Sequence, residues 1–361
     1  MKRFFHITIL FVLFFLILIF TKPEVFKYKF NNNLIKSYLC SQDIPYEPPC
    51  KRLFLSDSDI HIASGYLYIN GNDPASYNFQ HPPLIKYLFG LSINLFRNPY
   101  YVNLLFGLGL IFLTYFIALK IYKSEIVSFL SSLLLVVDPL FINISSSALF
   151  DIGQAFFLLL YFVSLFFIKN IWLLGISLGF LLASKFWGGS LFFLLLFWFF
   201  GFYKRKIETK KFLFHLLIAF ITLCFIYSKS FIDKGEFFNI MYFQLKVFKY
   251  WLQHSTTTMF GANLVLFLIG SFKSWWGNKS FSRSDVWSII WPISFFINMF
   301  ASYFYSKKSA INLKFLVSII PILYLFYLSA QAPFSRYFIL ILPFLYITTT
   351  GWIVNKYKFY N

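Results

Sequence analysis

The sequence has few acidic side chains, because its 361 residues include 13 Asp and Glu against 32 Lys and Arg, for a formal net charge of +19. Charged residues of both signs make up only 12% of the chain, whereas soluble domains average about 25%. This shortage argues against a water-exposed globular protein. The chain is instead 59% hydrophobic and contains 54 Phe residues, which indicates an integral membrane protein.

The polar segments carry no basic stripe interleaved with aromatic residues, so we expect no nucleic-acid partner. The excess of Lys and Arg suits the cytoplasmic flanks of membrane spans, where these side chains meet anionic headgroups. The length leaves room for roughly ten spans of about 20 residues each and for no separate soluble domain. No internal repeat of the transporter kind occurs.

Cysteine is also rare, with three residues in the chain. Cys224 lies in an apolar run, where we expect inert packing. Cys40 and Cys50 lie in the first long polar stretch, and a disulfide between them would require an oxidising, extracytoplasmic compartment. Sequence alone does not show the geometry of such a bridge, so the paired and the free states both stay open.

The apolar runs predict an all-α polytopic membrane protein with about ten to eleven transmembrane helices, folded as one domain over residues 1–361. Residues 4–20 form the first expected span, since no small-residue cleavage site follows them. The shorter run 84–96 suits an external helix that lies at the membrane interface. The other runs are 101–119, 124–142 with a break at Asp138-Pro139, 152–168, 171–183, 186–203, 212–228, 260–272, 286–304, 313–329 and 337–353.

The segment KRKIETKK at 204–211 has five basic residues in eight and marks a cytoplasmic loop. The spans counted back from it place the N-terminus on the same side. Residues 22–100 and 143–151 are therefore expected outside, and 229–259 form a second external, amphipathic region. Basic residues at 273–283 and at 307–314 compete for the inside, so the topology after residue 260 stays open.

Within the first external region, ionisable groups gather between Asp57 and Lys86. Such groups are costly in a membrane protein, which favours a functional interpretation. Asp57 and Asp59 are two residues apart and point in different directions on a strand or a helix. We expect one of them to act as a base while the other caps a helix or holds an acceptor, and the sequence favours Asp57 only slightly. His81-Pro82-Pro83-Leu84 and Lys86 follow, and the Lys86 ammonium could meet a lipid phosphate.

These motifs resemble the dolichyl-phosphate-mannose:protein O-mannosyltransferases, which have an acidic motif early in the first external loop and then HPPL-x-K. Four further segments are similar to that family in the same order. They are DPLFINISSSALFD ending at Asp151, ASKFWGG with Lys185, FQLKVFKYWLQHSTTT with Gln244 and His254, and SRYFILILPFL with Arg336. The sequence departs from the family in having Asp57-Ser58-Asp59 where an Asp-Glu pair is usual, and in lacking a β-trefoil insert.

The resemblance implies a GT-C type glycosyltransferase that moves a sugar, with mannose expected, from a polyprenyl or dolichyl phosphate to an acceptor hydroxyl on the extracytoplasmic face. It implies Asp57 or Asp59 as the catalytic base. Direct displacement would invert the configuration of the sugar. Substrate contacts are implied at His61, His81, Lys86, Asp151, Lys185, Gln244, His254 and Arg336.

Partners and alternatives follow from the same interpretation. Cations can stabilise a departing phosphate without a metal, so we expect no required cofactor, although Asp57 and Asp59 could hold a divalent ion. The acceptor is expected to be a protein Ser or Thr. A lipid or glycan acceptor, as in the related aminoarabinose transferases, is the alternative, and a dimer is left open. A transporter or flippase fits less well, because the charges gather at one face and the spans at 101–119 and 152–168 carry none.

Overall fold

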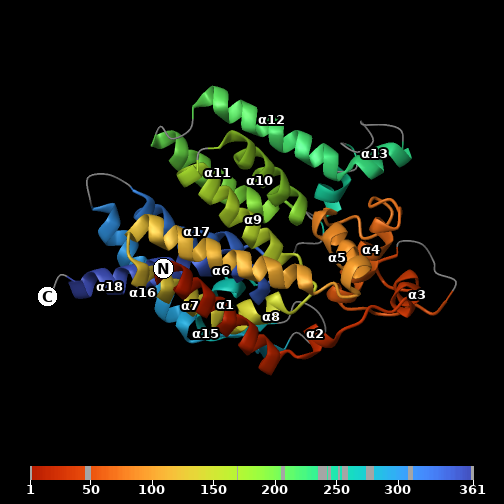
Figure 1. Ribbon diagram of the computed structural model, residues 1–361, viewed down its shortest axis with the longest axis horizontal. Helices are drawn as coiled ribbons and strands as arrows, with labels where there is room; N and C mark the ends of the chain where they lie inside the picture. The colour runs from red at the N-terminus through yellow and green to blue at the C-terminus, as the bar shows by residue number, and fades with distance from the viewer. Residues whose placement is uncertain are drawn as a thin grey trace. The chain divides into compact units, whose positions relative to one another are not determined.

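The computed structural model is almost entirely helical (Figure 1). It describes residues 2–44, 50–168, 170–204, 208–234, 242, 245–250, 253, 259–273, 280–307 and 312–358. The helices of the first half are α1 (Lys2–Thr21), α2 (Glu24–Lys27), α3 (Asn33–Leu39), α4 (Asp57–Ile69), α5 (Leu84–Phe96), α6 (Tyr101–Tyr122), α7 (Glu125–Val136), α8 (Pro139–Ser145) and α9 (Asp151–Val163), which continues as a π-helical segment, Ser164–Ile168. Those of the second half are α10 (Ile171–Ser184), α11 (Gly188–Tyr203), α12 (Thr209–Ile226), α13 (Ser228–Lys234), α15 (Ala262–Ile269), α16 (Ile290–Ser306), α17 (Leu313–Leu328) and α18 (Leu342–Lys358), which follows a 3₁₀ segment, Ser335–Leu340.

The chain forms two compact units. Unit 1 comprises Met1–Thr21, Gly107–Asn143 and Ser255–Asn361, and unit 2 comprises Lys22–Phe106 and Ile144–His254. The chain passes from one unit to the other four times, so neither unit is a continuous segment of sequence. Nearly all of the expected site residues fall in unit 2, and Arg336 falls in unit 1.

In unit 1, α16, α17 and α18 pack against one another, and α18 also packs against α7. Polar side chains join these helices inside the bundle. The buried Asn298 donates to Leu345 O and Thr349 Oγ1, each at 3.1 Å, and Ser131 and Thr350 share a hydrogen bond of 2.6 Å. Interhelical hydrogen bonds of this kind stabilise helix pairs where no water competes for the polar groups.

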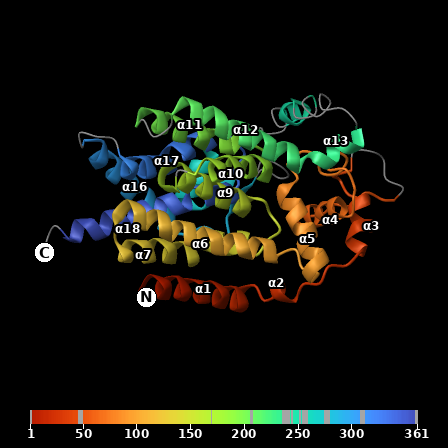
Figure 2. The same cartoon turned by 45° about the horizontal axis from the view of Figure 1, so that its top comes forward.

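In unit 2, α10 lies beside α12, as Figures 1 and 2 both show, because two glycines let the backbones approach closely. Gly175 and Gly179 are four residues apart in α10. A Cβ atom on Gly175 would lie 2.4 Å from Ile218 Cβ, and one on Gly179 would lie 2.6 Å from Thr222 Cβ. This is the small-xxx-small arrangement found between membrane helices.

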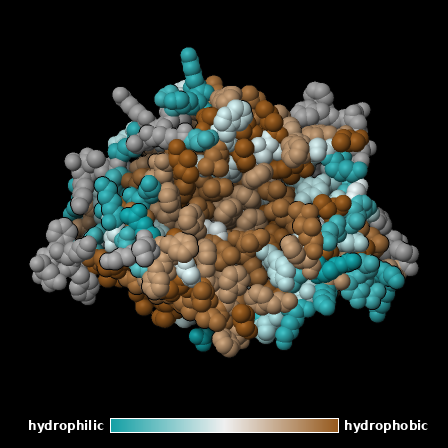
Figure 3. All heavy atoms as spheres, in the orientation of Figure 1, coloured by the Kyte–Doolittle hydropathy of each residue, from teal (hydrophilic) through white to brown (hydrophobic). Residues whose placement is uncertain are grey.

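The helices match the prediction of a multi-pass membrane protein. Among the described residues, four helices are long and apolar enough to cross a membrane, and five if α7 and α8 form one broken span. Large apolar side chains are exposed on these helices, as on α12, where Phe225 is 79% exposed. Figure 3 shows apolar side chains over much of the surface that faces the viewer. The larger number of about ten to eleven spans stays a prediction.

Most expected helices are confirmed within a few residues, and α5 has the bounds that its apolar run predicts. The expected break at Asp138-Pro139 is a bend of 66° between α7 and α8. Asp138 lies at this bend, where its carboxylate accepts from Trp291 Nε1 at 2.7 Å and from Tyr346 Oη at 2.5 Å.

The all-α class is confirmed, although the described residues also include one short strand pair. Strands β1 (Ser271–Lys273) and β2 (Phe281–Arg283) pair antiparallel, with Phe272 opposite Ser282. One detail of the prediction is wrong. The run 260–272 is not one long helix, since Gly270 adopts a positive φ of 73° and ends α15 after eight residues. A side chain on Gly270 would strike the Trp287 ring. Eight helical residues rise only about 12 Å, which is too short to cross a bilayer.

Residues 22–100, which the sequence predicts to lie outside, contain helices α2 to α5 in their described part. A disulfide joins Cys40 to Cys50 across the connection between α3 and α4, with Cα atoms 5.9 Å apart. The bridge left open by the sequence is therefore present. Helices α4 and α5 pack tightly, because a Cβ atom on Gly90 would lie 2.1 Å from Gly65 O.

Candidate functional site

The site begins at the first turn of α4, which has a side-chain cap. Ser56 Oγ accepts a hydrogen bond from the Asp59 backbone N–H at 3.2 Å and donates its own proton to Asp59 Oδ2 at 2.7 Å. This reciprocal pairing satisfies donors that a helix start otherwise leaves without a partner. Ser56 therefore caps the helix, and the Asp59 carboxylate supports the cap by accepting the Ser56 hydroxyl proton.

Asp59 also lies on a different side of α4 from Asp57. Burial, and after it the charges of Tyr28 and Asp59, raise the pKa of Tyr100 to about 12. Asp57 and Asp59 are two residues apart in the helix, which places them on different sides of it. Asp57 and His61 are four residues apart, so they share one face of α4. Asp57 is exposed at the helix start.

The face of α4 that carries His61 meets the loop before α9. His61 is buried, and its Nδ1 lies 2.9 Å from Ala148 O. Its ring packs on that of Phe150, with centroids 3.7 Å apart, and the His81 ring stands edge-on to both, at 5.8 Å from His61 and 5.2 Å from Phe150. Two of the expected substrate-binding residues, His61 and His81, are thus in direct contact.

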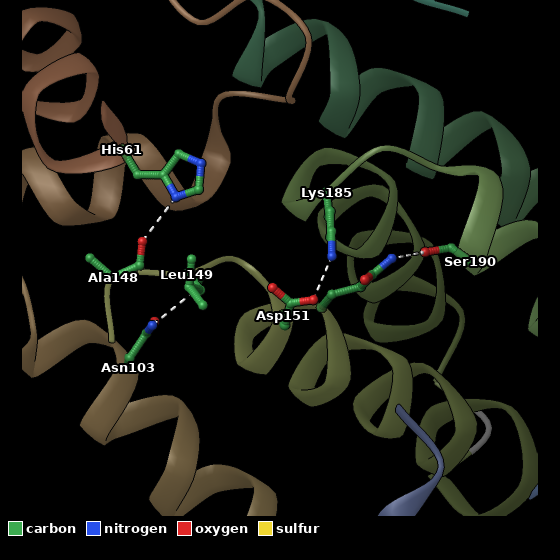
Figure 4. A network of polar contacts seen from close by, with 8 residues as sticks. His61, Asn103, Ala148, Leu149, Asp151, Lys185 and Ser190 are labelled. Carbon is green, nitrogen blue, oxygen red and sulfur yellow. Dashed lines mark hydrogen bonds and ion pairs between the residues drawn. The ribbon is translucent and has the colours of Figure 1, made fainter. Parts of the chain in front are cut away.

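Helix α6 also contacts the loop before α9. Asn103 Nδ2 donates to Ser147 O and, at 2.8 Å, to Leu149 O. Figure 4 shows this amide and the His61 ring on opposite sides of the loop. The chain between Ala148 and Asp151 is therefore fixed by side chains of α4 and α6, a rigid support for the residue that follows.

That residue is Asp151, the first residue of α9, and it forms an ion pair with Lys185. Lys185 Nζ lies 2.5 Å from Asp151 Oδ1, and the two side chains are 14% and 4% exposed (Figure 4). Lys185 directly follows α10. Nearby, Gln154 Nε2 donates to Ser190 Oγ at 2.9 Å and joins α9 to α11. The sequence places Asp151 and Lys185 in separate loops, and the fold brings them together.

Lys86 has a different role from the one expected. Its side chain is completely buried, and Nζ donates to Tyr68 Oη at 2.9 Å, Asn78 O at 2.6 Å and His81 O at 2.9 Å. An ammonium has three protons, and the protein accepts all of them. The expectation that Lys86 meets a lipid phosphate is corrected on this ground, because the group is enclosed and fully hydrogen-bonded. Burial lowers the pKa of Lys86 to about 7, against the opposing charge of Asp43.

Asp43 also binds the turn at residues 78–81, which Lys86 contacts through two of its carbonyl oxygens. Its carboxylate accepts from Tyr38 Oη at 2.7 Å, Asn78 Nδ2 at 2.9 Å and Gln80 Nε2 at 2.8 Å. Asn78 itself adopts a left-handed conformation, with a φ of 43°. Together, Asp43 and Lys86 fix the turn that leads into His81.

Three expected residues cannot be placed at this site. Gln244 and His254 lie outside the described residues. Arg336 belongs to unit 1, where its guanidinium lies 4.7 Å from the Phe334 ring centroid. No group of three or more His, Cys, Asp or Glu side chains that could hold a metal ion occurs in the described part of the chain. The expectations for these residues and for metal independence stay predictions.

The sequence did not single out Asp43, Tyr68, Asn103 or Phe150. Asp43 is the one with a usable signal, because it is another acid in the first external region and lies between the two disulfide-bonded cysteines. Tyr68, Asn103 and Phe150 act through contacts between elements that are distant in the chain, and nothing in their local sequence indicates this.

No family model matches the sequence, and no curated protein matches it. The fold is similar to the crystal structure of ArnT from Cupriavidus metallidurans bound to undecaprenyl phosphate, with a TM-score of 0.59, 13% identity and coverage of 89% of this chain and 59% of ArnT. The apo structure of ArnT gives a TM-score of 0.52, 14% identity and coverage of 89% and 58%. This chain therefore spans less than two thirds of the length of ArnT. The structure has the helical GT-C fold of ArnT.

Proposed function

We propose that this protein is a polyprenyl-phosphate-sugar-dependent glycosyltransferase. The observation that carries the proposal is the cluster of His61, His81, Asp151 and Lys185 in unit 2, which are linked through Phe150 and the loop before α9. Asp57 lies one helical turn before His61 in α4. The ArnT structure bound to undecaprenyl phosphate supports the same class of donor.

In this mechanism Asp57 takes the proton of the acceptor hydroxyl as its oxygen attacks the anomeric carbon of the sugar. The bond from that carbon to the phosphate oxygen breaks, and the polyprenyl phosphate leaves with the electron pair. Lys185 stabilises the departing phosphate. Its partner Asp151 holds the ammonium in place, and His61 and His81, which pack around Phe150, are the expected substrate contacts. The displacement inverts the configuration of the sugar.

The remaining assignments rest on the sequence resemblance. They are Arg336 as a second cation for the phosphate, and Gln244 and His254 as substrate contacts. Mannose is the sugar to test first on that ground, with a protein hydroxyl as acceptor. A lipid or glycan acceptor, as in the related aminoarabinose transferases, is the second choice. The Cys40–Cys50 disulfide supports an extracytoplasmic site, since such bridges form in oxidising compartments.

The test is to incubate the purified protein with polyprenyl-phosphate mannose labelled in the sugar, together with membrane lipids and acceptor proteins, and to follow the release of polyprenyl phosphate. We expect the wild type to transfer label and Lys185→Met to lose at least about a hundredfold in rate, as for loss of a transition-state electrostatic contact. Lys211→Met is the matched control, because Lys211 forms an exposed ion pair with Glu208. No donor turnover with mannose or other polyprenyl-phosphate sugars would overturn the proposal.

A further inference from the structure

A hollow of about 500 Å³ opens in unit 2 beside the helical residues 245–250. Its walls include Phe79, Tyr250 and two lysines, Lys246 and Lys249. Phe79 and Tyr250 meet edge-on, with ring centroids 5.8 Å apart. None of these four residues has a part in the proposed mechanism.

Lys246 and Lys249 both line the hollow. They are three residues apart on one helix face and both are exposed, so their charges repel one another. Neither forms an ion pair within the part of the chain that the structure describes. Lys246 Nζ lies 5.9 Å from the Phe79 ring centroid. Two neighbouring cations over an open hollow favour an anionic ligand.

Among the described residues, Asp43 influences this hollow, since burial and then the charge of Asp43 raise the pKa of Tyr250. Its carboxylate already accepts three hydrogen bonds, from Tyr38, Asn78 and Gln80. Asp43 is therefore engaged by the turn that precedes His81, and none of these three hydrogen bonds involves Lys246 or Lys249.

The rest of the lining indicates where that ligand comes from. Tyr242 and Leu245 also line the hollow, and both are exposed. Exposed aromatic and aliphatic side chains beside lysines are typical of the membrane interface, where hydrocarbon and phosphate lie next to each other. The hollow thus presents cations for a phosphate and apolar side chains for the start of a lipid chain.

Residues 245–250 also contact the segment before His81 and the segment after Lys185. Phe79 is two residues before His81. On the other side, the Phe248 ring stacks on Trp187, two residues after Lys185, with centroids 5.2 Å apart and planes 14° apart. A lipid headgroup in the hollow would lie next to the segments that hold His81 and Lys185.

We propose that this hollow binds the phosphate headgroup of a membrane lipid, with Lys246 and Lys249 as its cations and the Phe79 and Tyr250 rings as its wall. The site is a binding site in its own right and requires no sugar transfer. The lipid is either a polyprenyl phosphate carrier or a bulk anionic phospholipid, which offer the same phosphate chemistry.

The test is to measure lipid binding to the purified full chain in neutral detergent by native mass spectrometry. The probes are polyprenyl phosphate, phosphatidylglycerol and the uncharged polyprenol. We expect the Lys246→Gln/Lys249→Gln variant to bind the phosphate lipids about tenfold or more weakly than the wild type, and polyprenol to bind both proteins equally. The control is Lys210→Gln/Lys211→Gln, which removes two neighbouring lysines at the start of α12 and should bind as the wild type does.

The outcomes separate the two sources. A wild-type preference for polyprenyl phosphate over phosphatidylglycerol supports the proposal with the carrier as ligand, and equal binding of both supports it with bulk phospholipid. Equal phosphate-lipid binding by the wild type and the Lys246→Gln/Lys249→Gln variant, or the same loss in the control, overturns it. Binding is measured without a sugar donor, so failure of the proposed transferase activity would not affect this result.

Discussion

Lys185 and Asp151 form an almost fully buried ion pair, with Nζ 2.5 Å from Oδ1, although 33 residues separate them in the chain. Removal of one partner leaves the other as an uncompensated buried charge, which costs roughly 3–5 kcal/mol. We therefore expect Lys185→Met to lower the free energy of unfolding by about this amount. The Lys185→Met/Asp151→Asn double variant should recover much of the loss.

The measurement is a double-mutant cycle by denaturant unfolding in detergent micelles, with Lys211→Met as the control for an exposed pair. Exposed pairs contribute little, so the control should unfold as the wild type does. Additive losses in the Lys185 and Asp151 variants would contradict a coupled pair.

The N-cap of α4 predicts substitutions that change the free energy of unfolding but not the rate of sugar transfer. Ser56→Ala removes the side-chain acceptor at the helix start and should lower the free energy of unfolding by about 1 kcal/mol. Asp59→Asn should have a smaller effect, since an amide can still accept from Ser56. Both variants should keep sugar transfer within a few-fold of the wild type. A large loss of activity in a well-folded Asp59→Asn variant would instead identify Asp59 as a reacting group.

The glycine contact between α10 and α12 predicts a strong steric effect. Gly175→Leu places a branched side chain where even a Cβ atom would lie 2.4 Å from Ile218 Cβ. We expect a loss of about 1–3 kcal/mol or more, as in overpacked cores, measured as a lower midpoint of thermal unfolding. Ile176→Leu, on the more exposed side of the same helix, is the control. An unchanged midpoint for Gly175→Leu would mean that the two helices are not in contact.

Lys86 predicts a pH dependence of stability. The pKa of Lys86 is about 7 in the folded protein, whereas in the unfolded chain it has its ordinary value of 10.5. Between these two pH values the unfolded chain holds a proton that the folded protein has released. Stability therefore rises with pH in this window, by at most about 1.4 kcal/mol per pH unit. The slope is lost below pH 7, where both states hold the proton.

The check compares the wild type with Lys86→Met by denaturant unfolding at several pH values from 7 to 9. The variant lacks the titrating group, so the difference in unfolding free energy between the two proteins should grow with pH. The variant should also be less stable overall, because the carbonyls of Asn78 and His81 lose a buried donor. A difference that is constant with pH would show that Lys86 does not titrate in this range.

The sequence predicted those features that depend on local patterns. The apolar run 84–96 gave the bounds of α5, and Pro139 gave the break between α7 and α8. The contacts of His61 with His81 and of Asp151 with Lys185 join residues that the order of motifs had singled out. What the sequence did not reveal depends on tertiary partners.

Lys86 illustrates the difference. A lysine in the first turn of an apolar helix looks available for a phosphate, and only the fold shows that Tyr68 and two carbonyls enclose it. The strands β1 and β2 are three residues each, too short for a periodic pattern. The Lys246 and Lys249 hollow depends on Phe79, which is distant in the chain.

The most direct test of the account is the rate of sugar transfer from a polyprenyl-phosphate sugar by Asp57→Asn, compared with the wild type and with Asp59→Asn. An amide cannot take the acceptor proton, and loss of a general base typically costs about a hundredfold or more. The account predicts such a loss for a folded Asp57→Asn protein and near wild-type rates for Asp59→Asn. Full activity of Asp57→Asn would contradict it.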